Sequence, residues 1–266
     1  MLHVTELVPR LSYDQLVENG VISKFEINLT TRRFPKYVYD RESFMEYGMF
    51  IDYLVRRQIR EFGGETTSDL EPAQVILEEC LSSDDGSRDF PSYLESLDKY
   101  LDATLPWTSV IWHAYRLSSL HFGEEVYTRR EINSSFMNFR YMFEELSEKW
   151  RAYGLKTAAF NQGYQYGFIQ GHPDIVSELE LDGVSHRVVL DIKATQCFGA
   201  IRENSLLQVL SYAALINESD EPPITGIGFV FPVQREIVIF NLNNWDHRPF
   251  LTALVSVIAE AEEMIA

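Results

Sequence analysis

Two aspartates and a lysine in the C-terminal half of the chain have types and spacing suited to binding a divalent metal. Asp191 comes 17 positions after Asp174, and Lys193 follows two positions later. Side chains two residues apart in a strand point to the same face, so Asp191 and Lys193 would share one side of a sheet. Hard cations such as Mg²⁺ bind one or two carboxylates together with water and phosphate oxygens, and a nearby lysine orients or deprotonates the attacking water. These residues predict metal-assisted phosphate chemistry.

The segment between the two aspartates has the features of a β-hairpin. The later part of 175–181 alternates apolar and polar residues, Asp182-Gly183 is a turn signal, and 188–190 is an apolar run typical of a buried strand. An antiparallel return would bring Asp174 beside Asp191.

A second polar pair follows on an expected helix. Gln208 and Tyr212 are four positions apart, so they would lie one turn apart on the same helical face, where both can reach a phosphate. Apolar residues recur near helical spacing around them, and Asn217 ends the run.

Together these residues resemble the PD-(D/E)xK nuclease superfamily. Its signature is matched by Pro173-Asp174 and Asp191-Ile192-Lys193, and the Gln-x-x-x-Tyr motif of its RecB-like branch is matched by Gln208 and Tyr212. The resemblance covers roughly residues 164–241. It implies an α/β fold with a restriction-endonuclease-like core, in which a mixed central β-sheet is flanked by helices, here with a helical insertion.

The resemblance implies a metal-dependent nuclease that hydrolyses DNA phosphodiester bonds, with exonuclease-like action in recombination, repair or replication. Asp174, Asp191 and the backbone carbonyl of Ile192 would hold one or two Mg²⁺ ions, with Mn²⁺ as an alternative. Lys193 would position the water and stabilise developing charge.

Three further residues would contact the substrate or adjoin it. Gln208 and Tyr212 would hold the scissile phosphate or the strand end, as in the RecB-like branch. His172 directly precedes Pro173 and is a candidate for contact with a phosphate or a metal. His172 shares a face with Asp174 only if the backbone is regular through Pro173. Contact between His172 and the site is therefore expected no more than the lack of it.

The family's first motif, Gly-x-x-x-His on an upstream helix, is only partly matched. Asp52 stands four positions after Gly48 where the family has histidine, and oxygen suits Mg²⁺ better than nitrogen. Asp52 falls on the apolar stripe of a helix expected over 41–62, where a charge needs a partner. Glu46 competes for this role, but it lies about 200° around the helix from Gly48. We expect Asp52 to be the ligand.

The rest of the sequence divides the chain into four parts. They are an N-terminal cap at 1–40, a first core helix at 41–63, a helical insertion at 64–160 and the nuclease core at 161–266. The periodicity predicts several further elements. These are helices over 72–81, 93–119 and 129–153, strands from 164 onward, strands over 226–232 and 236–242, and a closing helix from 244.

Composition excludes other classes of protein. Hydrophobic residues make up 45% and charged residues 24% of 266 positions, and no stretch approaches the roughly 18 apolar residues of a membrane span. No secretion signal follows Met1, so we expect an intracellular protein, in the cytoplasm or, if it comes from a eukaryote or its virus, in the nucleus. Cys80 and Cys197 are the only cysteines, which excludes an iron–sulfur cluster built from the chain's own residues.

The net charge of −17 opposes tight binding to a phosphate backbone. Arginines such as Arg56, Arg57 and Arg60 could line a local basic groove, although intrahelical pairs such as Asp52 with Arg56 are the favoured interpretation. We therefore expect weak, salt-sensitive DNA binding or a protein partner that delivers the substrate.

Two alternatives to a nuclease remain. One is a non-catalytic nuclease-fold protein that serves as a DNA-binding or structural subunit of a larger complex. The acidic surface and the missing histidine favour it, whereas the intact Asp174, Asp191 and Lys193 oppose it. The other is a hydrolase of small phosphate esters, but the chain lacks a Gly-rich phosphate loop.

Overall fold

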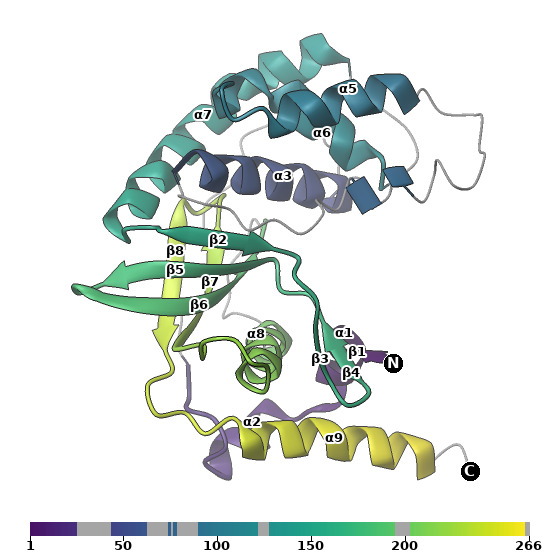
Figure 1. Ribbon diagram of the computed structural model, residues 1–266, viewed down its shortest axis with the longest axis vertical. Helices are drawn as coiled ribbons and strands as arrows, with labels where there is room; N and C mark the ends of the chain where they lie inside the picture. The colour runs from purple at the N-terminus through teal and green to yellow at the C-terminus, as the bar shows by residue number, and fades with distance from the viewer. Residues whose placement is uncertain are drawn as a thin grey trace.

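A mixed β-sheet lies between two groups of helices in the computed structural model of the chain (Figure 1). The structure describes residues 1–25, 44–62, 74–75, 77–78, 90–121, 128–194 and 203–263. In these residues the main sheet has five strands in the order β2-β5-β6-β7-β8. Their bounds are Thr157–Phe160, Ile175–Leu181, Val184–Ile192, Gly226–Phe231 and Glu236–Asn241. Within this main sheet, the described strands β6 and β7 pair in parallel and the other neighbours pair antiparallel, so the mixed sheet of the α/β fold is confirmed.

The expected hairpin is present between β5 and β6. The two strands pair antiparallel from Ile175 opposite Leu190 to Leu181 opposite Val184. Asp182 and Gly183 form the turn, and both have positive φ angles, which short polar residues and glycine tolerate best.

Helices cover one face of the sheet. They are α3 Phe44–Phe62, α5 Phe90–Leu101, α6 Ile111–Ser119 and α7 Arg129–Ala152. All but α3 lie within 64–160, the range expected for the helical insertion. Val188 and Leu190 of β6 pack against this layer, whereas Val189 between them packs into the opposite core. Both faces of the central strands are therefore buried, as their continuous apolar runs predict.

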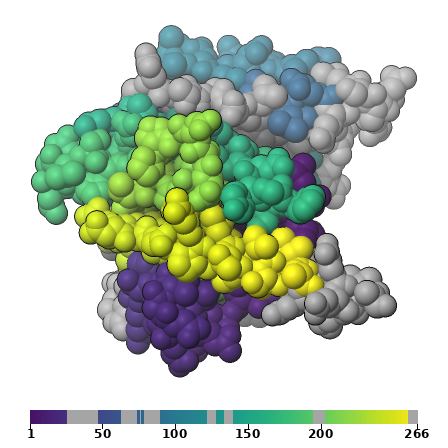
Figure 2. All heavy atoms as spheres, turned by 60° about the horizontal axis from the view of Figure 1, so that its bottom comes forward, coloured from purple at the N-terminus to yellow at the C-terminus, as the bar shows by residue number. Residues whose placement is uncertain are grey.

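The other face carries α8 Glu203–Asn217 and α9 Arg248–Glu263. Residues 1–25 pack here as well, with Val4 and Leu7 in the same core as the helix α8. Their elements are β1 Leu2–His3, α1 Val4–Leu7, the 3₁₀ turn Val8–Arg10 and α2 Tyr13–Glu18. Figure 2 shows this N-terminal segment, in purple, beside α9 in yellow.

A small second sheet contains the strand that precedes Asp174 in the chain. It has the order β1-β4-β3, with β3 at Tyr164–Tyr166 and β4 at Ile169–Gly171. β4 pairs antiparallel with β3 and parallel with β1, so the start of the chain is fixed beside the segment that precedes Asp174.

Two sequence predictions of elements were wrong. The continuous helix over 93–119 is divided into α5 and α6 by a segment with Pro106 and the 3₁₀ turn Trp107–Ser109, since proline restricts the residue before it and removes a backbone donor. The sheet begins earlier than expected, because β2 lies within 64–160, the range assigned to the insertion. Its four residues, Thr157–Phe160, are too few to show a clear alternation.

The other predicted helices and strands lie close to their expected bounds. The helix expected over 41–62 is α3, the one over 129–153 is α7, and the strands β7 and β8 end within one residue of prediction. Most of the helix expected over 72–81 lies outside the described residues. Among the residues that the structure describes, no helix is both long and apolar enough to span a bilayer.

Candidate functional site

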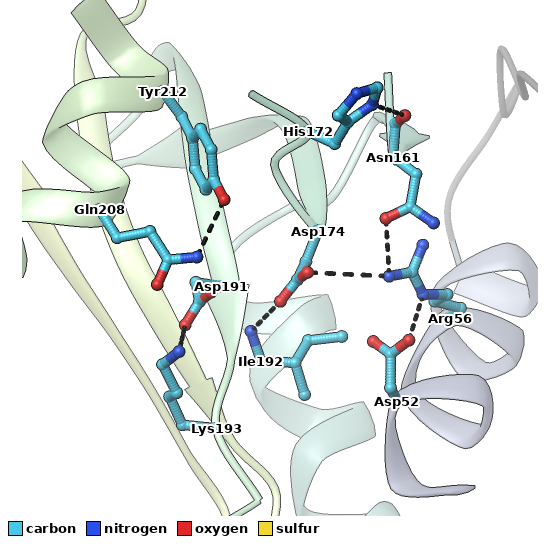
Figure 3. A network of polar contacts seen from close by, with 10 residues as sticks. All are labelled: Asp52, Arg56, Asn161, His172, Asp174, Asp191, Ile192, Lys193, Gln208 and Tyr212. Carbon is cyan, nitrogen blue, oxygen red and sulfur yellow. Dashed lines mark hydrogen bonds and ion pairs between the residues drawn. The ribbon is translucent and has the colours of Figure 1, made fainter. Parts of the chain in front are cut away.

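The site begins with Asp174, which lies directly before β5. The register of the hairpin places it next to Asp191 at the end of β6. Its Oδ2 atom accepts a hydrogen bond from the backbone N–H of Ile192 at 2.8 Å, and its side chain is 31% exposed. Two carboxylates from neighbouring strands therefore converge, as the sequence predicts (Figure 3).

Asp191, near the end of β6, and Lys193, one position beyond that strand, lie on the same side, as expected from their spacing. Lys193 Nζ is 2.6 Å from Asp191 Oδ2. Burial raises the pKa of Asp191 to about 7, Lys193 opposes that shift and the neighbouring Asp174 adds to it. Burial by itself would lower the pKa of Lys193, but the Asp191 carboxylate outweighs it and the net shift is upward.

The backbone of Ile192 faces the same point. In a strand, the N–H and C=O of one residue point toward the same neighbouring strand. Because the Ile192 N–H donates to Asp174, its carbonyl is also directed to the β5 side, whereas Lys193 N–H donates to Val230 of β7. This orientation agrees with the predicted role of the Ile192 carbonyl as a metal ligand.

Gln208 and Tyr212 lie one turn apart on α8, beside the aspartates (Figure 3). Gln208 Nε2 donates to the Tyr212 hydroxyl at 2.9 Å. Burial raises the pKa of Tyr212 above its usual value, and both aspartates contribute. The Tyr212 ring lies directly against Gly171 of β4, where a Cβ atom would be only 2.7 Å from the ring.

His172 lies at the margin of the site. Its ring is exposed, contacts the backbone oxygen of Asn161 through Nδ1 at 3.3 Å, and stacks on His3 with the ring centroids 5.8 Å apart. Figure 3 shows the ring turned toward Asn161 rather than between Asp174 and Asp191.

Asp52 on α3 reaches the site through an arginine. Arg56 Nε donates to Asp52 Oδ2 at 2.8 Å, which confirms the intrahelical pair expected from the sequence. The other end of the Arg56 guanidinium, Nη2, donates to Asn161 Oδ1 at 3.2 Å and lies 3.9 Å from Asp174 Oδ1. The side chain of Glu46, the competing candidate, lies outside the described residues.

A pocket of about 430 Å³ opens beside Asp174, and its lining includes Asp52 and Lys193 but not Asp191, Gln208, Tyr212 or His172. Gly48 and Met49 of α3 and Ile192 of β6 lie on its wall. The polar and charged residues that line it are Asp52, Arg56, His121, Asn161, Asp174 and Lys193. The pocket therefore lies between α3 and the end of the strands β5 and β6 where Asp174 and Lys193 are found.

Sequence reasoning missed two residues of this pocket. Asn161 follows β2 and has a left-handed backbone with φ of 51°, which asparagine tolerates better than most residues, but it belongs to no motif. His121 follows α6, and its Nε2 lies 3.2 Å from the Tyr53 hydroxyl. Burial, with Arg56 nearby, lowers the pKa of His121, so a neutral imidazole lines the pocket. Neither residue has a neighbour in sequence that signals its place.

The residues at the adjoining ends of β5 and β6 fit a small, hard cation. Among the described residues, no three histidine, cysteine, aspartate or glutamate side chains form a group that could hold a metal by themselves. Mg²⁺ commonly takes only one or two protein carboxylates and completes its octahedron with water and substrate phosphate. Asp174 and Asp191, with the Ile192 carbonyl, supply such a partial set of oxygen ligands.

No protein-family model matches the chain, and no curated protein matches it significantly. The resemblance to PD-(D/E)xK nucleases therefore rests on the residues of the sequence alone.

Proposed function

We propose that the chain is a metal-dependent nuclease that hydrolyses DNA phosphodiester bonds, with exonuclease-like action in recombination, repair or replication. One observation carries the proposal. Asp174, directly before β5, lies beside Asp191 near the end of the adjacent strand β6, and Lys193 lies 2.6 Å from Asp191. This set of groups suits phosphate chemistry with a divalent cation.

Asp174, Asp191 and the carbonyl of Ile192 would hold Mg²⁺, with Mn²⁺ as an alternative. When bound, the cation would polarise the phosphate and lower the pKa of water. Asp52 lines the pocket, but its carboxylate is held by Arg56, so we leave it out of this ligand set.

Lys193 would orient water and stabilise negative charge. Its raised pKa keeps the side chain as an ammonium, which donates hydrogen bonds and does not accept a proton from water. This protonation state favours orienting the water over deprotonating it, the two roles that the sequence left open.

Gln208 would hold the substrate phosphate. It is the more exposed member of the pair on α8, and its amide is oriented by the buried Tyr212 hydroxyl. On this assignment Tyr212 acts through Gln208 rather than by direct contact with the phosphate.

The function is tested with purified protein and end-labelled linear and circular DNA, each single- and double-stranded, in Mg²⁺, Mn²⁺ or EDTA. We expect metal-dependent cleavage that Lys193→Ala abolishes and Lys156→Ala retains. Lys156 is the matched control, since it forms an exposed ion pair with Glu180 at 3.5 Å. Preference for linear DNA would identify an exonuclease, and full activity of Lys193→Ala would refute the proposed site.

The second candidate is a non-catalytic nuclease-fold protein that binds DNA or serves as a structural subunit of a larger complex. The net charge of −17 favours it, because a nuclease working alone benefits from a basic groove. Metal binding without cleavage of any of these substrates would support this candidate against the first.

A further inference from the structure

Arg56 is a buried cation fixed from several sides at the wall of the pocket. Its side chain is only 2% exposed. It donates to Asp52 at 2.8 Å and to Asn161 at 3.2 Å, and its guanidinium carbon lies 5.4 Å from the centre of the Phe160 ring. Burying a charge is costly unless it is paired, and Asp52 supplies that pairing within the same helix.

The contact between Arg56 and Asp174 is of a different kind. The separation of 3.9 Å is too long for a hydrogen bond, so the attraction between these two groups is Coulombic. Figure 3 shows the guanidinium directed from α3 toward the Asp174 carboxylate. A positive charge is thus held beside Asp174, the proposed metal ligand, without a hydrogen bond to it.

We propose that Arg56 is a substrate-binding residue whose guanidinium contacts a nucleic-acid phosphate next to the metal, and that Asp52 and Asn161 are positioning residues that hold it there. The proposal rests on the nuclease function proposed above. A guanidinium is always charged, and its planar array of donors matches phosphate oxygens. A strongly acidic chain needs such a local cation to receive a phosphate.

This substrate-binding role predicts opposite changes in metal binding and substrate binding, which a purely structural role does not. A fixed cation 3.9 Å from Asp174 repels Mg²⁺ but attracts phosphate. Arg56→Gln should therefore tighten metal binding, by roughly threefold or more, while weakening substrate binding by about tenfold. If Arg56 only supported the fold, its loss would displace Asp174 and weaken both.

The first test compares Arg56→Gln, Arg56→Lys and Arg60→Gln with the wild type. Mn²⁺ binding is measured by calorimetry without DNA, and KM and kcat are measured with Mg²⁺ and linear DNA. Arg60 is the matched control, because it lies one turn along α3, also contacts the Phe160 ring at 5.2 Å, and carries the same charge. We expect wild-type values for Arg60→Gln and an intermediate KM for Arg56→Lys.

Asp52→Asn provides a second variant that leaves the Arg56 side chain in place. As a positioning residue, Asp52 should affect KM and change the Mn²⁺ affinity by less than about threefold. As a metal ligand, its loss should weaken Mn²⁺ binding by at least about tenfold. The second result would overturn the assignment even if Arg56→Gln does not fold.

The outcomes separate this proposal from the proposed function. Wild-type protein that neither binds Mn²⁺ nor cuts DNA would refute the nuclease, and the role of Arg56 with it. If the wild type binds Mn²⁺ without cutting, fluorescence anisotropy of a labelled DNA oligonucleotide in Mn²⁺ replaces KM. If the wild type is active and Arg56→Gln weakens both kinds of binding, or changes neither, the role of Arg56 is wrong while the nuclease stands.

Discussion

The Asp174 carboxylate accepts a hydrogen bond from the backbone N–H of Ile192 at 2.8 Å. It thereby links the start of β5 to the end of β6, one position beyond the last backbone pair of the two strands, Ile175 with Leu190. Asp174 is therefore both a proposed metal ligand and a residue that stabilises the end of the β5–β6 pair.

This double role predicts different stabilities for two variants at position 174. Asparagine keeps an oxygen acceptor for the Ile192 N–H, whereas alanine leaves that donor without it, at a cost of about 1 kcal/mol. Both variants lose the charge that repels Asp191, so the comparison isolates the hydrogen bond. We expect both to be inactive and Asp174→Ala to have the lower free energy of unfolding in urea. Equal stabilities would show that the bond contributes nothing.

The stability of the folded chain should depend on the ionisation of Asp191. Burial raises the pKa of Asp191 to about 7. The unfolded chain should ionise it near the ordinary value of 3.8. Between these pH values the folded state keeps a proton that the unfolded state has released, so the free energy of unfolding falls as the pH rises. This loss in the free energy of unfolding is absent below about pH 4 and complete above about pH 7.

Asp191→Asn should remove this dependence. In EDTA, we expect the wild type to lose on the order of 2 kcal/mol between about pH 5 and pH 8, and the variant to show a flatter profile. Urea unfolding followed by circular dichroism measures both profiles. Mg²⁺ should restore wild-type stability at the higher pH, because it favours the ionised carboxylate. Parallel profiles for the two proteins would contradict the assignment of the titration to Asp191.

Gly171 should tolerate no side chain. A Cβ atom there would lie 2.7 Å from the Tyr212 ring and 3.1 Å from Val4. Gly171→Ala should therefore displace the ring, cost about 1–3 kcal/mol of stability and lower the cleavage rate through Gln208. Gly48→Ala is the contrast in stability. Apart from the backbone of its own helix, no atom of the described residues lies within 4 Å of where its Cβ would be, and alanine favours the helix. A higher melting temperature for Gly171→Ala than for Gly48→Ala in a thermal unfolding scan would refute the close contact.

The hydrogen bond between Gln208 and Tyr212 predicts coupled effects. Tyr212→Phe keeps the buried ring but removes the hydroxyl that accepts from Gln208, so it should raise KM about fivefold with little change in stability. Gln208→Ala should raise KM further, because it removes the proposed phosphate contact itself. The double variant should resemble Gln208→Ala alone, since Tyr212 acts through Gln208. Additive increases in KM would show that each residue contacts the substrate independently.

The sequence by itself determined the parts of the site that depend on short-range geometry. Asp191 and Lys193 share a face because side chains alternate along a strand, and Asp174 returns beside them because Asp182-Gly183 closes a tight turn. Gln208 and Tyr212 meet because four residues make about one turn of a helix. In each case the contact follows from the repeat of a single element or hairpin.

Only the tertiary structure decided how elements distant in sequence meet at the candidate site. Arg56 contacts Asn161 across 105 positions, and no periodicity encodes that approach. The ion pair of Asp52 with Arg56 follows from their spacing of four residues, but only the packing of α3 against β2 brings Arg56 close to Asp174. His172 lies between β4 of the small sheet and β5 of the main sheet, and its ring contacts the backbone of Asn161. Such contacts depend on which apolar faces pack together, and many packings satisfy the same local pattern.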